Sequence, residues 1–134
     1  MDLVTMVEFL ITSIVGGLST YFLSNYSSLS AVKSSIIATL LFLIVFHVWS
    51  SFHEANEQLQ SVFFGASFVG MSGKKIINWI EALLASALYA FALFYALPYF
   101  GGMGGALGTS AAITVITVYL CKIAVKKLNQ KNVE

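Results

Sequence analysis

The chain has 134 residues, of which 58% are apolar, 14% are aromatic and only 10% are charged, and its mean hydropathy is +0.86. This leaves too little polar surface to solvate a globule in water, so the composition predicts an integral membrane protein. A net charge of +1, with seven lysines and no arginine, excludes the basic face that nucleic-acid binding requires.

Four apolar runs are long enough to cross a bilayer, which takes about 20 residues per helix. They cover residues 3–24, 34–52, 76–97 and 106–125, and a polar tail follows at 126–134. The first run begins beside the acids Asp2 and Glu8, where a secretory signal has basic residues, so we expect it to remain as a helix. The sequence therefore predicts an all-α integral membrane protein with a single transmembrane domain over residues 1–134.

The lysines suggest an orientation for these four helices. If the tail is cytoplasmic, six lysines lie on the cytoplasmic side and only Lys33 lies outside. Cytoplasmic loops are enriched in lysine and arginine. This distribution favours both termini in the cytoplasm, in a bacterial-type inner or plasma membrane.

The segment 61–73 fits neither a full span nor an ordinary loop, because positions 63–73 read FFGASFVGMSG. As a crossing helix it would be about 18 Å long, short of a hydrocarbon core of about 30 Å. A crossing is also expected to place the two following lysines opposite the tail. An interfacial helix and a re-entrant segment both remain open. In the re-entrant alternative, close-approach glycines alternate with hydroxyls that face a wet cavity, and the residues concerned are Gly65, Ser67, Gly70 and Ser72.

The first helix carries small and polar residues at every fourth position, which lie on one helix face: Glu8, Thr12, Gly16, Thr20 and Ser24. Such a face serves either close helix packing or a path for an ion or small solute. The second helix is bulky almost all round and is expected to face mostly lipid.

Ionisable residues recur at one depth in the predicted topology. Glu8, His47 and Glu81 each lie about 7 to 8 Å from the cytoplasmic end of a helix, with Lys122 slightly shallower. Together they predict a polar layer, and intramembrane ionisable groups are candidates for an ion or proton path. The alternative is that the carboxylates snorkel to the surface and that His47 is interfacial. Glu81 is expected to pair with His47 or Lys122.

A second glycine-rich segment, FGGMGGALGTSAA, begins at Phe100 and leads into the fourth helix. Free N–H groups at a helix start favour an anion, and unwound backbone carbonyls suit a cation. The candidate constriction residues are Gly105, Gly108, Thr109 and Ser110. An ordinary glycine-rich turn is the alternative.

No motif indicates catalysis or a metal site. The string HEANE at His53 lacks the second histidine of a zinc site, and GGMGG has neither the spacing nor the preceding strand of a dinucleotide fingerprint. The single Cys121 excludes an internal disulfide and a thiolate cluster. We therefore expect no enzymatic activity, no cofactor and no bound metal.

The expected function is that of a channel or transporter protomer for an ion or small solute. Four helices of this size rarely enclose a path alone, so the expected partners are further copies of the chain, the surrounding lipid bilayer and the transported species. Two alternatives remain open. One is a non-conducting accessory or structural subunit of a larger membrane complex, which docks through its small-residue faces. The other is a holin-like membrane effector.

Overall fold

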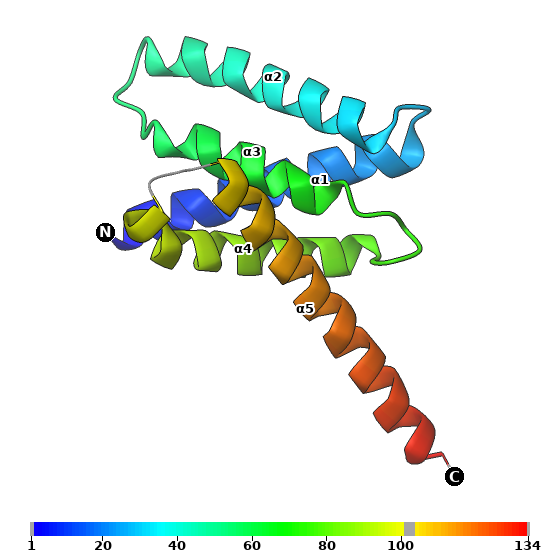
Figure 1. Ribbon diagram of the computed structural model, residues 1–134. Helices are drawn as coiled ribbons and strands as arrows, with labels where there is room; N and C mark the ends of the chain where they lie inside the picture. Colours follow the sequence, from blue (N-terminus) through cyan, green and yellow to red (C-terminus); the bar gives the residue numbers. More distant parts are fainter. Residues whose placement is uncertain (1, 101–103, 134) are drawn as a thin grey trace.

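The computed structural model describes residues 2–100 and 104–133, and it is all-helical in that part of the chain. Five helices follow one another (Figure 1): α1 (Leu3–Tyr26), α2 (Ala31–Ser50), α3 (Gln58–Gly70), α4 (Trp79–Phe100) and α5 (Gly104–Lys131). Four of them, all except α3, are long and apolar enough to cross a membrane. This confirms the prediction of an all-α chain with four candidate spans and indicates a membrane protein.

Local capping explains where some of the helices begin. Ser30 precedes α2, and its hydroxyl accepts a hydrogen bond from the Lys33 N–H. Asn78 precedes α4 and forms a reciprocal capping box with Glu81: the Asn78 N–H donates to Glu81 Oε2 at 2.8 Å, and the Glu81 N–H donates to Asn78 Oδ1 at 2.9 Å. The third span therefore begins at residue 79, where the sequence predicted residue 76. It continues past Pro98, which lies in its last turn.

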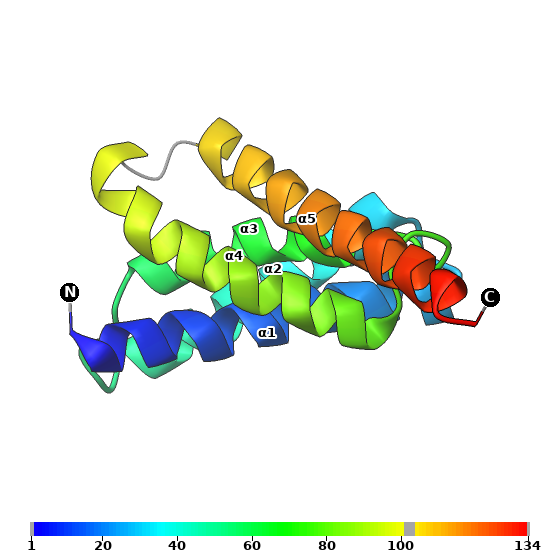
Figure 2. The ribbon, with the colours of Figure 1, turned by 90° about the horizontal axis from the view of Figure 1, so that it is seen from below.

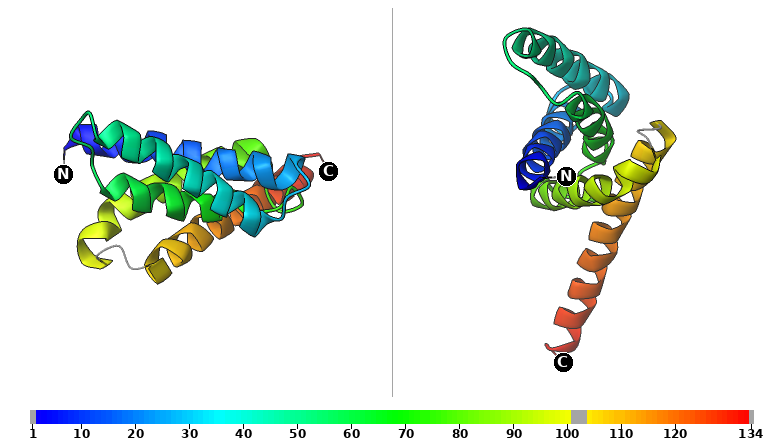
Figure 3. Two further views of the ribbon diagram at one scale, coloured as in Figure 1. Left: turned by 90° about the horizontal axis from the view of Figure 1, so that it is seen from above. Right: turned by 90° about the vertical axis from the view of Figure 1, so that its left-hand side faces the viewer.

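The short helix α3 occupies the centre of the bundle. It contacts each of the other four helices, and seven of its thirteen residues are buried. Figure 3, in which the bundle is viewed from above and from one end, places α3 between α2 on one side and α4 and α5 on the other. An interfacial helix would leave one face to the membrane surface. The structure does not confirm that reading for the segment 61–73.

The re-entrant reading is not confirmed either, because α3 does not return to the end where it starts. It begins at the end of the bundle where α2 finishes, and it ends at the opposite end, where the connection to α4 begins (Figure 1). Thirteen residues of helix measure about 20 Å. The irregular connections at 51–57 and 71–78 cover the rest of the length of the bundle.

The direction of α3 decides at which end of the bundle each terminus lies. Helices α1 to α4 alternate in direction and α5 returns obliquely, so the N-terminus and the C-terminus lie at opposite ends (Figure 1). This differs from the expectation that both termini share one side. Lys74 and Lys75 lie at the end of the bundle where α5 finishes, whereas a full-length pass of α3 was expected to separate them from the tail. Such a pass reverses the ends at which α1 and α2 begin, and it does not change the ends of α4 and α5.

Polar residues of α2 point inwards while its bulky residues point outwards. The buried residues of α2 are Ser34, Ser35, Ala38 and Phe46, whereas its outer surface presents Ile36, Leu40, Leu41, Ile44, Val45 and Val48. Lipid tails solvate such an outer face and water does not. The prediction that α2 faces mostly outwards is confirmed.

Candidate functional site

The small face of α1 is covered by α3 and α4. A β-carbon added at Gly16 would lie 3.0 Å from the Phe63 carbonyl oxygen, and one at Gly17 would lie 3.1 Å from Ser86 Cβ. Thr20 is fully buried beside Gly70. Of the two uses proposed for this face, close helix packing is the one observed along Gly16, Gly17 and Thr20.

Buried hydroxyls make hydrogen bonds between helices. The Ser13 hydroxyl donates to the Ser86 carbonyl at 2.6 Å and joins α1 to α4. The hydroxyl oxygens of Ser35 and Ser67 lie 2.6 Å apart, and their hydrogen bond joins α2 to α3. Ser67 also donates to its own helix, at the Phe64 carbonyl. Ser67 therefore contributes to packing and does not face a cavity.

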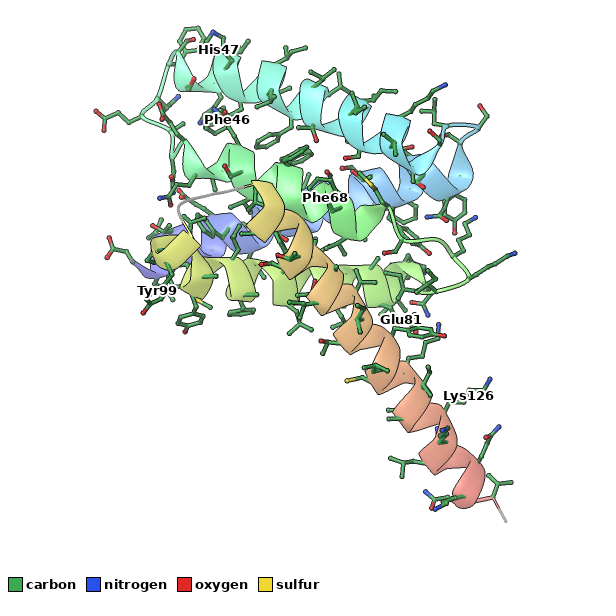
Figure 4. All side chains as sticks on the ribbon, viewed as in Figure 1. Phe46, His47, Phe68, Glu81, Tyr99 and Lys126 are labelled. Carbon is green, nitrogen blue, oxygen red and sulfur yellow. The ribbon has the colours of Figure 1, made fainter. Side chains whose placement is uncertain are left out.

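The predicted polar layer is divided between the two ends of the bundle. Figure 4 places His47 and Glu81 at opposite ends. Glu8 is half-buried near the start of α1, with Thr12 one turn further along, at the same end as the exposed His47. The polar layer was predicted on the assumption that residues 61–73 do not run the length of the bundle. With α3 in place, Glu8 and His47 are separated from Glu81 by the length of the bundle.

Glu81 pairs with Lys122, one of the two partners that the sequence suggested. Lys122 Nζ lies 3.0 Å from Glu81 Oε2 and donates to the Ile76 carbonyl at 3.3 Å. Because Glu81 also caps α4, its carboxylate holds the start of α4 against the middle of α5. Glu81 is therefore a structural link at one end of the bundle.

Asn25, at the end of α1, organises the irregular chain after α3, and the sequence reasoning missed it. Its side-chain amide donates to the carbonyls of Tyr21 and Ser72, and its Oδ1 accepts the Lys74 N–H at 3.0 Å. The Tyr21 hydroxyl donates to the buried Ile77 carbonyl at 2.8 Å. Non-helical backbone at membrane depth needs such partners. The signal in the sequence that could have identified Asn25 is an amide side chain directly after the apolar run 3–24.

The lysines gather at one end of the bundle. Lys33 lies in the first turn of α2, Lys74 and Lys75 lie between α3 and α4, and the other four follow from Lys122 along α5. Of the six carboxylates, Glu81 is paired with Lys122 at this end, and Glu134 lies outside the described residues. The remaining four, Asp2, Glu8, Glu54 and Glu57, lie at the end where α1 begins. We refer to these as the lysine-rich end and the N-terminal end.

The start of α5 has an open small-residue surface. Among the described residues, no atom lies within 4 Å of a β-carbon added at Gly104, Gly105 or Gly108, and Ala112 on the same side is exposed. Thr109 donates to the carbonyls of Gly105 and Ala106 in its own helix, and Ser110 is half-buried. We call Gly104, Gly105, Gly108 and Ala112 the small face of α5. The connection at 101–103 lies outside the described residues.

Among residues 2–100 and 104–133, no group of three or more histidine, cysteine, aspartate or glutamate side chains is arranged to hold a metal ion. Cys121 is exposed on α5 as a free thiol. The buried hydroxyls of Thr20, Thr39 and Tyr89 have no hydrogen-bond partner within the described chain. They are scattered over three helices and do not converge on one site.

A comparison of this chain with protein-family models, with curated protein sequences and with solved structures finds no match.

Proposed function

We propose that the chain is the protomer of a homo-oligomeric membrane channel or transporter, in which any path for an ion or small solute runs between protomers. Two features support a path outside the single chain. The face of α1 that the sequence suggested as a lining is filled by Phe63 and Ser86, and the ionisable residues lie at the ends of the bundle.

The observation that carries the proposal is the open small face of α5. Small residues in membrane helices allow a second helix to approach closely, and such surfaces are enriched at helix–helix interfaces. In the core of this chain, Gly16 and Gly70 are each filled by a neighbour, whereas Gly105 and Gly108 have open space beside them. A second copy of the chain would supply the missing contact.

A matched pair of substitutions tests the assembly. Ala112→Leu adds three carbons to the small face of α5, and Ala92→Leu adds the same group to an exposed position of α4. We expect the parent to migrate as an oligomer in mild detergent and Ala112→Leu to weaken association by about 5- to 150-fold, since overpacking costs about 1 to 3 kcal/mol. Ala92→Leu should migrate as the parent does. Mass measured by light scattering reports the result.

The same proteins in liposomes test conduction. Ion or solute flux should require the parent oligomer and should fall in Ala112→Leu along with the mass. A parent that is monomeric at every concentration would argue against this function and for an accessory subunit that docks on a different protein. A stable oligomer that shows no flux would support the proposed assembly and contradict the proposed conduction.

We propose in addition that the lysine-rich end faces the cytoplasm, because cytoplasmic segments carry the excess of lysine. Single cysteines at Ser28 and Glu54, both exposed connections, are placed in a Cys121→Ala background. An impermeant thiol reagent added to intact cells should label position 54 and spare position 28. A topology of four spans with both termini inside requires the reverse pattern.

A further inference from the structure

A groove runs between α4 and α5 at the lysine-rich end. The two helices are in contact, and α5 diverges from α4 as it approaches the C-terminus (Figure 1 and Figure 2). All four buried residues of α5 (Leu107, Ala111, Thr114 and Val118) lie in its first half. The open side beyond them forms a groove of about 1320 Å³.

The lining of this groove changes in character along its length. Towards the middle of the bundle the walls are apolar, with Leu84 and Leu88 from α4 and Val118 from α5. From Lys122 onwards the polar side chains of Lys122, Lys126, Asn129 and Gln130 join the lining, beside the apolar Val125 and Val133. The nine residue steps from Thr117 to Lys126 span about 14 Å of helix. The lining therefore suits an occupant with an apolar part and a polar part.

The charges at the polar end favour an anion. The carboxylate of Glu81 is occupied by Lys122 and by the Asn78 N–H. In the described part of the chain, that is the one ion pair, so Lys126 enters the groove with its positive charge unneutralised. Asn129 and Gln130 add amide N–H donors beside it. Figure 4 shows Glu81 and Lys126 on the two helices that border the groove.

We propose that this groove is a binding site for an anionic glycerophospholipid. An acyl chain lies along Leu84, Leu88 and Val118, and the phosphate contacts Lys126 with Asn129 and Gln130. Basic pockets between membrane helices on the cytoplasmic side bind anionic headgroups, and lysine binds phosphate as a point charge without the planar geometry of arginine. This inference concerns a lipid of the surrounding bilayer and does not depend on conduction or on assembly.

The test compares lipids on delipidated protein in a neutral detergent. Phosphatidylglycerol should raise the melting temperature more than phosphatidylcholine does, and it should persist as a bound adduct in native mass spectrometry. Lys126→Gln should weaken phosphatidylglycerol binding about fivefold. The matched control is Lys33→Gln, which removes a lysine from the same end on α2, away from the groove, and should leave that binding unchanged.

A second variant keeps the charges and fills the apolar part. Leu88→Trp should reduce phosphatidylglycerol binding, and Leu41→Trp on the outer face of α2 should not. Equal effects of the two lipids, or equal losses in Lys126→Gln and Lys33→Gln, would overturn the proposal in favour of diffuse attraction. Equal stabilisation by inorganic phosphate would indicate an anion site without lipid. If phosphatidylglycerol binds only after the oligomers are dissociated, the proposal is overturned, and the groove is instead the contact site of a second copy of the chain.

Discussion

Replacing Gly70 by alanine is expected to destabilise the bundle by about 3 kcal/mol, at the upper end of the usual cost of overpacking. A β-carbon at this position would contact the Gly17 carbonyl oxygen and would lie 2.6 Å from Thr20 Cβ and 2.8 Å from the Tyr21 nitrogen. Two of these three atoms belong to the backbone of α1, so the neighbour cannot yield by a side-chain rotation. Helix α3 would have to move away from α1.

The matched control is Gly73→Ala in the connection between α3 and α4, where the new methyl group meets no described atom within 4 Å. Alanine restricts the unfolded chain more than glycine does, so this variant should be neutral or slightly more stable. The measurement is thermal or denaturant unfolding of purified protein in one detergent. A Gly70→Ala protein that unfolds with the parent would show that α1 and α3 do not pack as described.

The second large effect is expected for Phe63→Ala. Phe63 is 2% exposed, stacks on Phe42 with ring centroids 4.1 Å apart, and fills the space beside Gly16. Removing the ring should cost about 3 kcal/mol through the cavity and the lost contacts. In a bilayer, helix association depends on such packing more than on transfer from water.

The adjacent Phe64 provides the control, because it belongs to the same helix and is 39% exposed. Phe64→Ala should cost about 1 kcal/mol or less, since less of its ring is packed. The difference in unfolding free energy between the two variants is the informative quantity. Equal losses would mean that α3 presents a different face to α1 and α2.

The four long helices could be predicted from the sequence because length and apolar composition alone determine whether a segment can cross a bilayer. The outward face of α2 was also predictable, and Lys122 was one of the two partners expected for Glu81, since bulky apolar residues favour lipid and a carboxylate within an apolar helix needs a cation. These expectations depend on properties that each residue carries by itself.

The role of the segment around Gly65 and Gly70 could not be predicted in the same way. Its glycines were expected to allow close approach, and they do, but the approaching groups are Tyr89 and the backbone of α1. The residues that pack beside a glycine are set by contacts between distant parts of the chain. The periodicity of small and apolar residues along the sequence does not reveal these contacts. The end of the bundle at which Glu8, His47 and Lys33 lie, relative to α4 and α5, depends on the direction of that one segment. The structure therefore places all three at the end opposite to the one expected.

The central position of α3 has a consequence for biosynthesis. A 13-residue helix with hydroxyls and glycines on its surface is too short and too polar to partition into lipid alone. The hairpin of α1 and α2 is made first, and its inner sides present Gly16, Thr20, Ser34 and Ser35. These residues provide a protein surface against which α3 can pack. The insertion of α3 during translation is therefore expected to follow that of the hairpin and to be completed only when α4 packs over α3.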